Sequence, residues 1–441
     1  MARTRSRRLK ADSAVRPPWC HLFDTGFGTH VLLVNGSRVF TISPEVARGL
    51  DDPSADPDLL LERLGLAAPP YVTDEPPTDL PVRSLSLAIA QKCNLGCTYC
   101  YAQEGAFGST ERNMSPEAAR AAVVLLFSQA GAGDRVQLSF LGGEPLTNRG
   151  LLRECTEQAA SLARGRGVRV GFSITTNGTL LTPDDGEFFE RHEFAVTVSL
   201  DGIGRVHDRL RPFKSGRGTY ARVVANVGPL LAMQRRMQVS ARVTVTPRNV
   251  DLRATLDEFL GMGFHHVGFS PMLSSPTGAG EMGQADLAVM LGQMIDCGQE
   301  FERRVGRGER YAFSNVSTAL HEIHKGTHRP YPCGAGGGYF GVSADGDLYA
   351  CHRFVEDEAA ALGDVRAGVE PGRQARWLAD RHLHRQEPCR TCWARYLCGG
   401  GCHHEVIHRG RPACDYIRGW LHYCLQAYVR VLERRPDFFR A

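Results

Sequence analysis

Three cysteines in the run Cys93-x3-Cys97-x2-Cys100 are the residues of this chain with the clearest chemical potential. Thiolates spaced this closely hold iron–sulfur clusters, and an [Fe4S4] cube has four irons, of which three cysteines hold only three. The fourth iron is then open to an exogenous ligand that chelates through an amine and a carboxylate. The spacing therefore predicts a redox cluster that also binds a small molecule, with a partial zinc site as the alternative.

A second group of cysteines lies in the carboxyl-terminal part of the chain. The chain has 14 cysteines and no export signal, a combination that indicates metal ligation rather than disulfides. Cys424, ten residues after Cys414 on a predicted helix, is a candidate to replace it. The spaced cysteines of this group are Cys333, Cys351, Cys389, Cys392, Cys398, Cys402 and Cys414.

Short apolar strands alternate with helical stretches from about residue 83, the pattern of repeated βα units with a parallel sheet. The carboxyl ends of barrel strands are where active sites assemble. Four motifs follow four consecutive predicted strands: Cys93 to Cys100, Gly142-Gly143-Glu144-Pro145, Thr175-Thr176-Asn177-Gly178 and Ser199-Leu200-Asp201-Gly202. The six predicted strands lie near 84–90, 136–141, 169–175, 194–200, 239–246 and 265–270, and they indicate an incomplete barrel.

Composition divides the rest of the chain. An Asn35-Gly36 turn between two β-rich runs predicts a hairpin over 29–42, followed by short helices near 44–50 and 57–65 and a Pro-rich linker. We expect five parts: a disordered basic arm over 1–18, a small α+β unit over 19–80, the barrel over 83–285, a helical bridge over 286–332 and a cysteine-rich domain over 333–441.

The first motif, with Tyr99 before its third cysteine and the Gly-Gly-Glu-Pro motif about 40 residues on, resembles the radical S-adenosylmethionine (SAM) superfamily. The carboxyl-terminal spacing resembles the SPASM extension of that superfamily, found in enzymes that modify peptides and proteins. The resemblance implies an α/β fold, a partial (β/α)6 TIM-like barrel with a C-terminal cysteine-rich SPASM iron–sulfur domain and a small N-terminal α+β unit.

The resemblance also implies SAM as cofactor and a set of residues that contact it. The glycine pair would present backbone groups to the methionine amine, Glu144 would help to hold that amine, and backbone near Tyr99 would meet the adenine. Arg242 would pair with the methionine carboxylate. The implied SAM-contact residues are Tyr99, Gly142, Gly143, Glu144, Asn177, Ser199, Asp201 and Arg242.

Three clusters follow from the same resemblance. The catalytic [4Fe-4S] cluster would be held by Cys93, Cys97 and Cys100, and two auxiliary [4Fe-4S] clusters would be held farther along. Some relatives carry one more cysteine about six residues after the first of the auxiliary motif, where this chain has Tyr339. The implied auxiliary ligand sets are Cys389, Cys392, Cys398 and Cys414 for one cluster and Cys333, Cys351 and Cys402 for the other.

The implied activity is oxidative modification of a ribosomally synthesised precursor peptide, most simply an intramolecular cross-link through a thioether, C–C or C–O bond. The alternative is oxidation of the formylglycine type, as in sulfatase maturases. In that branch an aspartate that acts as a base follows the second cysteine of the auxiliary motif, whereas here His352 follows Cys351. Residues 19–80 are then a possible leader-peptide recognition element, which would add the peptide as a strand to a sheet edge.

Partners and compartment follow from composition and from the resemblance. A flavodoxin or ferredoxin is the expected electron donor. A net charge of +4 over 441 residues does not predict nucleic-acid binding. No apolar run of about 20 residues occurs, so we expect a cytoplasmic protein without a membrane partner.

Two further patterns are expected to have no catalytic role. His404-Glu405-Val406-Ile407-His408 matches a zinc-protease motif but lies inside the cysteine framework, which favours a solvated helix face. Gly336-x-Gly338-x2-Gly341 matches a dinucleotide fingerprint but leads into a predicted hairpin rather than from a strand into a helix.

Overall fold

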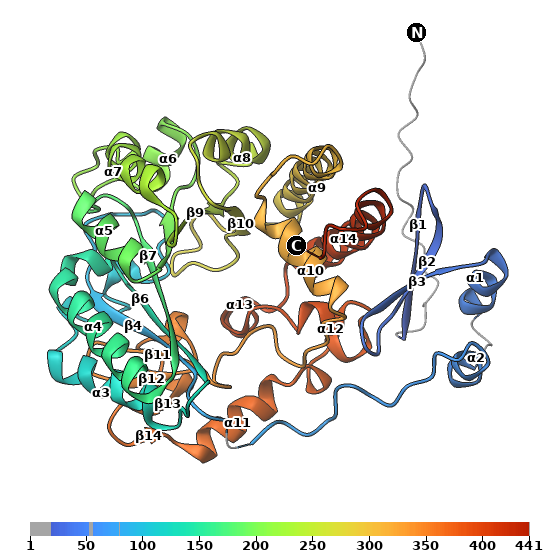
Figure 1. The fold of residues 1–441 in the computed structure, drawn as a ribbon, viewed down its shortest axis with the longest axis horizontal. Coiled ribbons are helices and arrows are strands. Elements are labelled where there is room, and N and C mark those ends of the chain that lie inside the picture. The colour runs from blue at the N-terminus through green and yellow to red at the C-terminus, as the bar shows by residue number, and fades with distance from the viewer. Residues whose placement is uncertain (1–18, 53–55, 79, 441) are drawn as a thin grey trace, which may run out of the picture.

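A computed structural model describes residues 19–52, 56–78 and 80–440. The predicted disordered arm, residues 1–18, lies outside the described residues. The described chain forms a small antiparallel sheet and a large mixed sheet, which lie on opposite sides of the molecule (Figure 1).

The small sheet contains β1 (Cys20–Thr25), β2 (Gly28–Leu33) and β3 (Arg38–Ile42) in antiparallel order. The predicted hairpin at Asn35-Gly36 is confirmed as β2 and β3, whereas β1 was not predicted. The helices α1 (Pro44–Asp51) and α2 (Pro57–Arg63) follow, each with a proline in its first turn and a side-chain cap before it. Their apolar residues pack on the sheet to form a small core of their own.

Six parallel strands form the barrel part of the large sheet, and all six predicted strands are confirmed within about two residues. The fold is α/β, a partial barrel. The strands pair in the order β4 (Ser84–Gln91), β6 (Arg135–Gly142), β7 (Arg169–Thr176), β8 (Ala195–Ser199), β9 (Gln238–Val245) and β10 (Val267–Pro271).

Helices cover the outer face of this curved sheet, as Figure 1 shows. Alternate residues of each strand face them: on β9, Val239, Ala241 and Val243 are buried, while Ser240 and Arg242 between them are less buried. The inner face is therefore polar, which suits it to bind a polar ligand. The covering helices are α3 (Pro116–Ser128), α4 (Arg149–Arg166), α5 (Pro183–Arg191), α7 (Tyr220–Met233) and α8 (Leu252–Gly261).

The carboxyl-terminal region continues the barrel sheet. After α9 (Gln284–Gly306) and α10 (Ser314–His324), β11 (Tyr339–Val342) pairs in parallel with β4. β12 (Asp347–Tyr349), β13 (Ala361–Asp364) and β14 (Gly368–Val369) extend the sheet antiparallel, and the predicted hairpin after Gly338 is β11 and β12. The cysteine-rich region is thus joined to the barrel by backbone hydrogen bonds.

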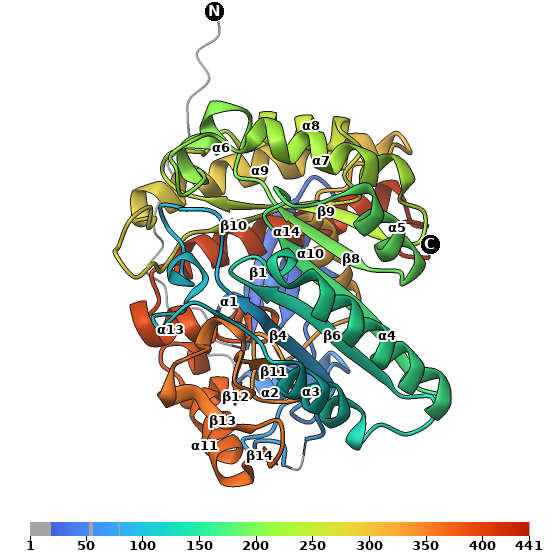
Figure 2. The ribbon, with the colours of Figure 1, turned by 90° about the vertical axis from the view of Figure 1, so that its left-hand side faces the viewer.

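The last helices are α11 (Pro371–Arg381), α12 (Arg395–Cys398), α13 (His403–Arg409) and α14 (Cys414–Arg434). They lie in different places (Figure 2): α11 packs against β13, whereas α14 packs against α9, α10 and β1. The short elements are β5 (Arg112–Asn113), α6 (Arg205–Leu210) and the 3-10 helices η1 (Gln103–Gly105), η2 (Pro145–Asn148), η3 (His352–Phe354), η4 (Glu358–Ala360), η5 (Leu383–Arg385) and η6 (Cys389–Thr391). Within the described part of the chain, no helix has the length and apolar character needed to cross a membrane.

Candidate functional site

The first cysteine loop begins where β4 ends and is braced by a segment from another part of the barrel. Gly96 N–H donates to the Pro212 carbonyl over 2.9 Å, and Thr98 N–H donates to the Leu210 carbonyl over 3.1 Å. These bonds hold the backbone between Cys93 and Cys100 in place without any ligand.

The three thiols of this loop lie close together. Burial raises the pKa of Cys93 to about 11, and the neighbouring Cys100 adds to the effect. Burial likewise raises the pKa of Cys97 to about 12, and Cys100 and Cys93 again add to it. Thiols so placed ionise readily only when a metal replaces the proton, so the loop suits cluster ligation.

The predicted glycine pair closes against this loop. Gly142 has a φ of +146°, and a Cβ there would lie 2.2 Å from the Ala90 carbonyl oxygen. A Cβ on Gly143 would lie 2.3 Å from the Lys92 carbonyl oxygen. Only glycine allows the end of β6 to approach the start of the cysteine loop so closely.

Glu144 ties the second motif to the third. Its carboxylate is wholly buried and accepts hydrogen bonds from Leu146 N–H at 3.1 Å, Thr176 Oγ1–H at 2.8 Å and Asn177 N–H at 2.8 Å. Burial raises the pKa of Glu144, and these three bonds oppose the rise. The role predicted for Glu144 at the methionine amine stays a prediction.

Asn177 joins the third motif to the first. Its side-chain amide donates to Asn94 Oδ1 over 2.9 Å and lies 3.8 Å from Cys93 Sγ. Ser199, half-buried at the end of β8, is paired in register with Arg242 on β9. The structure thus brings the four motifs to one edge of the barrel, while their contacts with SAM stay predictions.

A buried polar cluster supports this edge. Tyr99 Oη–H donates to Asp201, and Arg211 donates to Tyr99 Oη over 2.8 Å and lies 3.5 Å from the Asp201 carboxylate. Thr244 N–H donates to the other oxygen of Asp201 over 2.8 Å. Burial raises the pKa of Asp201, against the lowering effect of Arg211. Tyr99 and Asp201, both predicted SAM contacts, are therefore bonded to each other.

Arg211 was missed from the sequence. It lies in the loop after α6, and no motif spacing marks it. The weak signal available was an arginine before Pro212 in a segment that follows the fourth strand motif.

Arg242, the predicted partner of the methionine carboxylate, lies on the inner face and donates to Ser270 Oγ. It also lines a hollow of about 280 Å³ with Ser314, Asn315 and Glu322 of α10. It is thus directed toward α10, and its predicted ion pair with SAM stays a prediction.

His207 of α6 supports the polar cluster of Tyr99, Asp201 and Arg211, and it must be neutral to do so. Its Nδ1 accepts from Asp201 N–H at 3.1 Å, and its Nε2 lies 3.0 Å from Thr219 Oγ1, whose hydroxyl donates to the Arg211 carbonyl. Burial lowers the pKa of His207 to about 3, and Arg211 adds to the effect. A proton on Nδ1 would face the hydrogen of the Asp201 N–H, so protonation of His207 would break this hydrogen bond.

We expect the protein to lose stability in acid through His207. The folded pKa is depressed, so between about 6.5 and 3 the unfolded chain binds the proton that the folded chain refuses. The free energy of unfolding should fall by up to about 1.4 kcal/mol for each pH unit in this window and be fully retained above it. Urea unfolding at pH 7.5 and 5.5 measures the fall, and His207→Gln should reduce it. An equal fall in both proteins would contradict this account.

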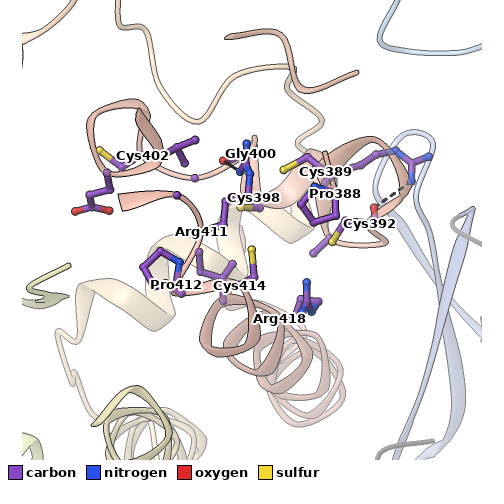
Figure 3. Close-up of a pocket in the computed structure, with 18 of the residues that line it drawn as sticks. Pro388, Cys389, Cys392, Cys398, Gly400, Cys402, Arg411, Pro412, Cys414 and Arg418 are labelled. Atoms are coloured by element: carbon purple, nitrogen blue, oxygen red, sulfur yellow. Dashed lines mark hydrogen bonds between the residues drawn. The ribbon is translucent and has the colours of Figure 1, made fainter. Parts of the chain in front are cut away.

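Four of the carboxyl-terminal cysteines face one another. Figure 3 shows the sulfurs of Cys389, Cys392, Cys398 and Cys414 directed into one space, with the sulfur of Cys402 directed away from it. This space has a volume of about 60 Å³. Burial raises the pKa of Cys389 to about 11, and the other three thiols add to the effect. We call these four residues the outer thiol set.

Cys333, Cys351 and Cys402 form a second group, the inner thiol set. Burial raises the pKa of Cys351 to about 12, and Cys402 and Cys333 add to the rise. Tyr339, at the position where the resemblance led us to expect a further cysteine in some relatives, lies beside them: burial raises its pKa, and Cys351 and Cys333 contribute. Its hydroxyl lies 2.6 Å from Nδ1 of His352.

Cys424 is not placed to replace Cys414. It lies ten residues farther along α14, about 15 Å along the helix axis, and its side chain is wholly buried. Burial raises its pKa, and Glu302 of α9 is the charged group that adds to the rise. Cys424 therefore belongs to the packing of α14 against α9.

A pocket of about 540 Å³ lies between the segment that follows Cys100 and the segment that follows Cys351, and its lining contains no cysteine. We call it the junction pocket. Its wall includes residues that follow Cys100, residues of the loop after β10 and residues of η3 and α13. Its lining includes Tyr101, Glu281, Arg353 and Arg409.

These sites fit iron–sulfur clusters. In residues 19–52, 56–78 and 80–440, no three His, Cys, Asp or Glu side chains are arranged to hold a metal ion. A cube spreads its ligand thiols over several irons, so they lie farther apart than the ligands of one ion. The thiols form three separate sets, two of three and one of four, and the four thiols of the outer set line one common space. Ligation by each cysteine stays a prediction.

Comparison with known proteins identifies the barrel. Residues 87–247 match the radical SAM superfamily. The chain is 26% identical over 359 residues, 78% of its length and 85% of the relative's, to a serine-type anaerobic sulfatase-maturating enzyme of Klebsiella aerogenes.

Two solved structures share the fold. The structure of native anSMEcpe with bound AdoMet has a TM-score of 0.66 at 20% identity and covers 79% of this chain and 99% of its own. The structure of Streptococcus suis SuiB bound to the precursor peptide SuiA has a TM-score of 0.54 at 14% identity and covers 90% and 97%. The partial barrel with its cysteine-rich extension is thus a known architecture.

Proposed function

On the premise that this chain is a radical SAM enzyme of the SPASM type, we propose that it forms an intramolecular cross-link, a thioether by preference, in a ribosomally synthesised peptide. The first cysteine loop would hold the catalytic cluster, the motifs at the barrel edge would hold SAM, and the two further thiol sets would hold auxiliary clusters. When bound, these groups supply a 5′-deoxyadenosyl radical, which removes hydrogen from carbon, and an acceptor for one electron.

The proposed reaction balances without a further oxidant. One C–H bond and one S–H bond of the peptide break, and one C–S bond forms. The carbon's hydrogen atom leaves in 5′-deoxyadenosine, and the thiol hydrogen leaves as a proton. The electron that the peptide gives up replaces the electron spent on cleaving SAM to methionine. A flavodoxin or ferredoxin would supply the first electron.

The observation that carries the proposal is that the inner set has three thiols beside Tyr339 and His352. A cube bound by three cysteines leaves one iron open. Arg353, which lines the junction pocket, has its Nη1 3.8 Å from Cys402 Sγ of the inner set. A peptide in that pocket would have both the first cysteine loop and the inner set within reach.

The second candidate is oxidation of the formylglycine type. It is favoured by the sulfatase-maturating relatives of Klebsiella aerogenes and of Clostridium novyi, the latter a cysteine-type enzyme 25% identical over 343 residues. Against it stands His352, where the resemblance to that branch leads us to expect an aspartate. His352 is bonded to Tyr339, and burial lowers its pKa to about 4, so it is neutral and not an anionic base.

Peptide mass spectrometry separates the two candidates. Reconstituted enzyme, SAM and a reductant are incubated anaerobically with the precursor peptide encoded beside the gene, and the product is alkylated and fragmented. Loss of two hydrogens with a cysteine that no longer alkylates supports the thioether. Loss of two hydrogens with alkylation unchanged supports a C–C or C–O link. Conversion of a cysteine or serine of a sulfatase peptide to formylglycine would overturn the cross-linking proposal.

We further propose that residues 19–80 bind the leader of that peptide. In the described residues β3 pairs with β2 alone, and its residues are partly exposed. β1, at the other edge, packs against α14, where Gln426 donates to the Asp24 carbonyl over 3.0 Å. An extended leader can therefore add as a strand beside β3.

Hydrogen exchange tests this binding. With the full precursor peptide we expect the β3 amides to exchange at least about 10-fold more slowly, because a strand added at an open edge bonds to them. The β1 amides and a peptide without its leader serve as controls and should show no change. Protection elsewhere with none at β3 would contradict leader binding at this edge.

A further inference from the structure

Arg353 contacts both halves of the site. It follows Cys351 by two residues in η3, and its Nη1 donates to Glu405 over 2.8 Å and lies 3.8 Å from Cys402 Sγ. Its guanidinium carbon lies 5.3 Å from the centre of the Tyr101 ring. Tyr101 directly follows Cys100, so one side chain contacts the segment of the first cysteine motif and the inner thiol set.

The Arg353 charge lies in a largely enclosed place. Its side chain is 18% exposed, and its Nε is buried without a hydrogen-bond partner. A buried donor without a hydrogen bond costs free energy. The contacts of the other guanidinium atoms must therefore offset this cost and hold the side chain in place. Those contacts are Glu405, the Cys402 sulfur and the face of Tyr101.

Arginine suits this position better than lysine. Its planar guanidinium stacks on an aromatic face while its edge donates to an anion, and lysine carries a point charge that cannot do both. Arg409, which lines the same pocket, differs: it pairs with Glu281 and donates to the Leu273 carbonyl, and its side chain is 46% exposed. Arg409 contacts neither thiol set, so it is the matched control.

We propose that Arg353 is a positioning residue that raises the reduction potential of the cluster held by the inner thiol set and thereby favours transfer of the peptide's electron to it. This inference rests on the proposed function for the source of the electron. A cluster gains negative charge on reduction, and a nearby cation and an N–H donor to a ligand sulfur both stabilise the reduced form. Glu405, bonded to the same guanidinium, acts in the opposite direction.

The opposite signs of Arg353 and Glu405 give the test. EPR-monitored redox titration is made on the auxiliary clusters in a Cys93→Ala/Cys97→Ala/Cys100→Ala background, without SAM or peptide. Arg353→Gln should shift one auxiliary signal to lower potential, and Glu405→Gln should shift the same signal to higher potential. Arg353→Lys should give a smaller downward shift, and Arg409→Gln should give none.

The titration can fail independently of the cross-linking assay, because it uses neither SAM nor peptide. If both auxiliary signals keep their potential in Arg353→Gln and in Glu405→Gln at full iron content, the proposal is wrong. If Arg353→Gln loses iron, the Glu405→Gln variant alone tests the proposal. A Glu405→Gln variant in which neither auxiliary cluster rises in reduction potential would overturn it. In the complete enzyme, Arg353→Gln should raise 5′-deoxyadenosine released per product by at least about 10-fold. Arg236→Gln, at the exposed pair with Glu193, should leave this ratio unchanged.

Discussion

Replacement of Cys97 by alanine should abolish SAM cleavage. Its thiol lies with those of Cys93 and Cys100 in a loop that the backbone already holds in place. Loss of one of the three predicted ligands would remove the cluster proposed to start the reaction, and we expect release of 5′-deoxyadenosine to fall by more than about 10³-fold. Chromatographic assay of 5′-deoxyadenosine in the reconstituted variant measures this directly.

Two controls accompany the Cys97 variant. Cys155→Ala removes a buried thiol of α4 outside the three sets and should leave iron content and cleavage unchanged. Cys389→Ala removes one thiol of the outer set and should lower iron content while the SAM cluster still assembles. Normal cleavage in Cys97→Ala would disprove its role as a ligand, and full iron content and activity in Cys389→Ala would disprove the outer cluster.

The second large effect is expected at the buried ion pair of Arg211 and Asp201. Arg211→Met would leave the wholly buried Asp201 carboxylate without its cation and would remove the bond from Arg211 to Tyr99. Breaking a buried pair from one side costs about 3 to 5 kcal/mol. We expect a loss of this size in the free energy of unfolding, measured in urea.

The same substitution at an exposed pair is the control. Arg236 pairs with Glu193 on the surface, where both side chains are more than half exposed. Arg236→Met should therefore change stability by less than about 1 kcal/mol. A loss at Arg211 no larger than that at Arg236 would show that the buried cluster does not hold the barrel edge. Asp201→Asn/Arg211→Met, compared with each single variant, measures the coupling between the two residues.

Local patterns in the chain were enough to find the barrel. The apolar runs that become β4, β6, β7, β8, β9 and β10 are short, and each is followed by a motif or a helix. Parallel strands with right-handed helical connections bring successive carboxyl ends together, so the four motifs were expected at one edge. The bonds of Asn177 to Asn94 and of Glu144 to Asn177 confirm that neighbourhood.

Residues whose role depends on distant contacts were not predictable in this way. Arg211 lies in no motif, and Arg353 lies beside Cys351 with nothing in the spacing to mark its contacts. In both, separate segments of the chain meet at the guanidinium. β1 was missed because His21, Phe23 and Asp24 give no regular alternation before the Gly26-Phe27-Gly28 turn. Cys424 was an open alternative until its burial beside Glu302 of α9 was known.

The parallel pairing of β11 with β4 has a consequence for synthesis of the chain. β4 is made early, yet the strand that covers one of its edges, starting with Tyr339 opposite Ser84, leaves the ribosome much later. Until then the apolar Leu85 and Leu87 lie next to an open edge, and open edges of apolar strands recruit other chains. A nascent or truncated chain that ends before Tyr339 should therefore aggregate rather than form a free-standing barrel.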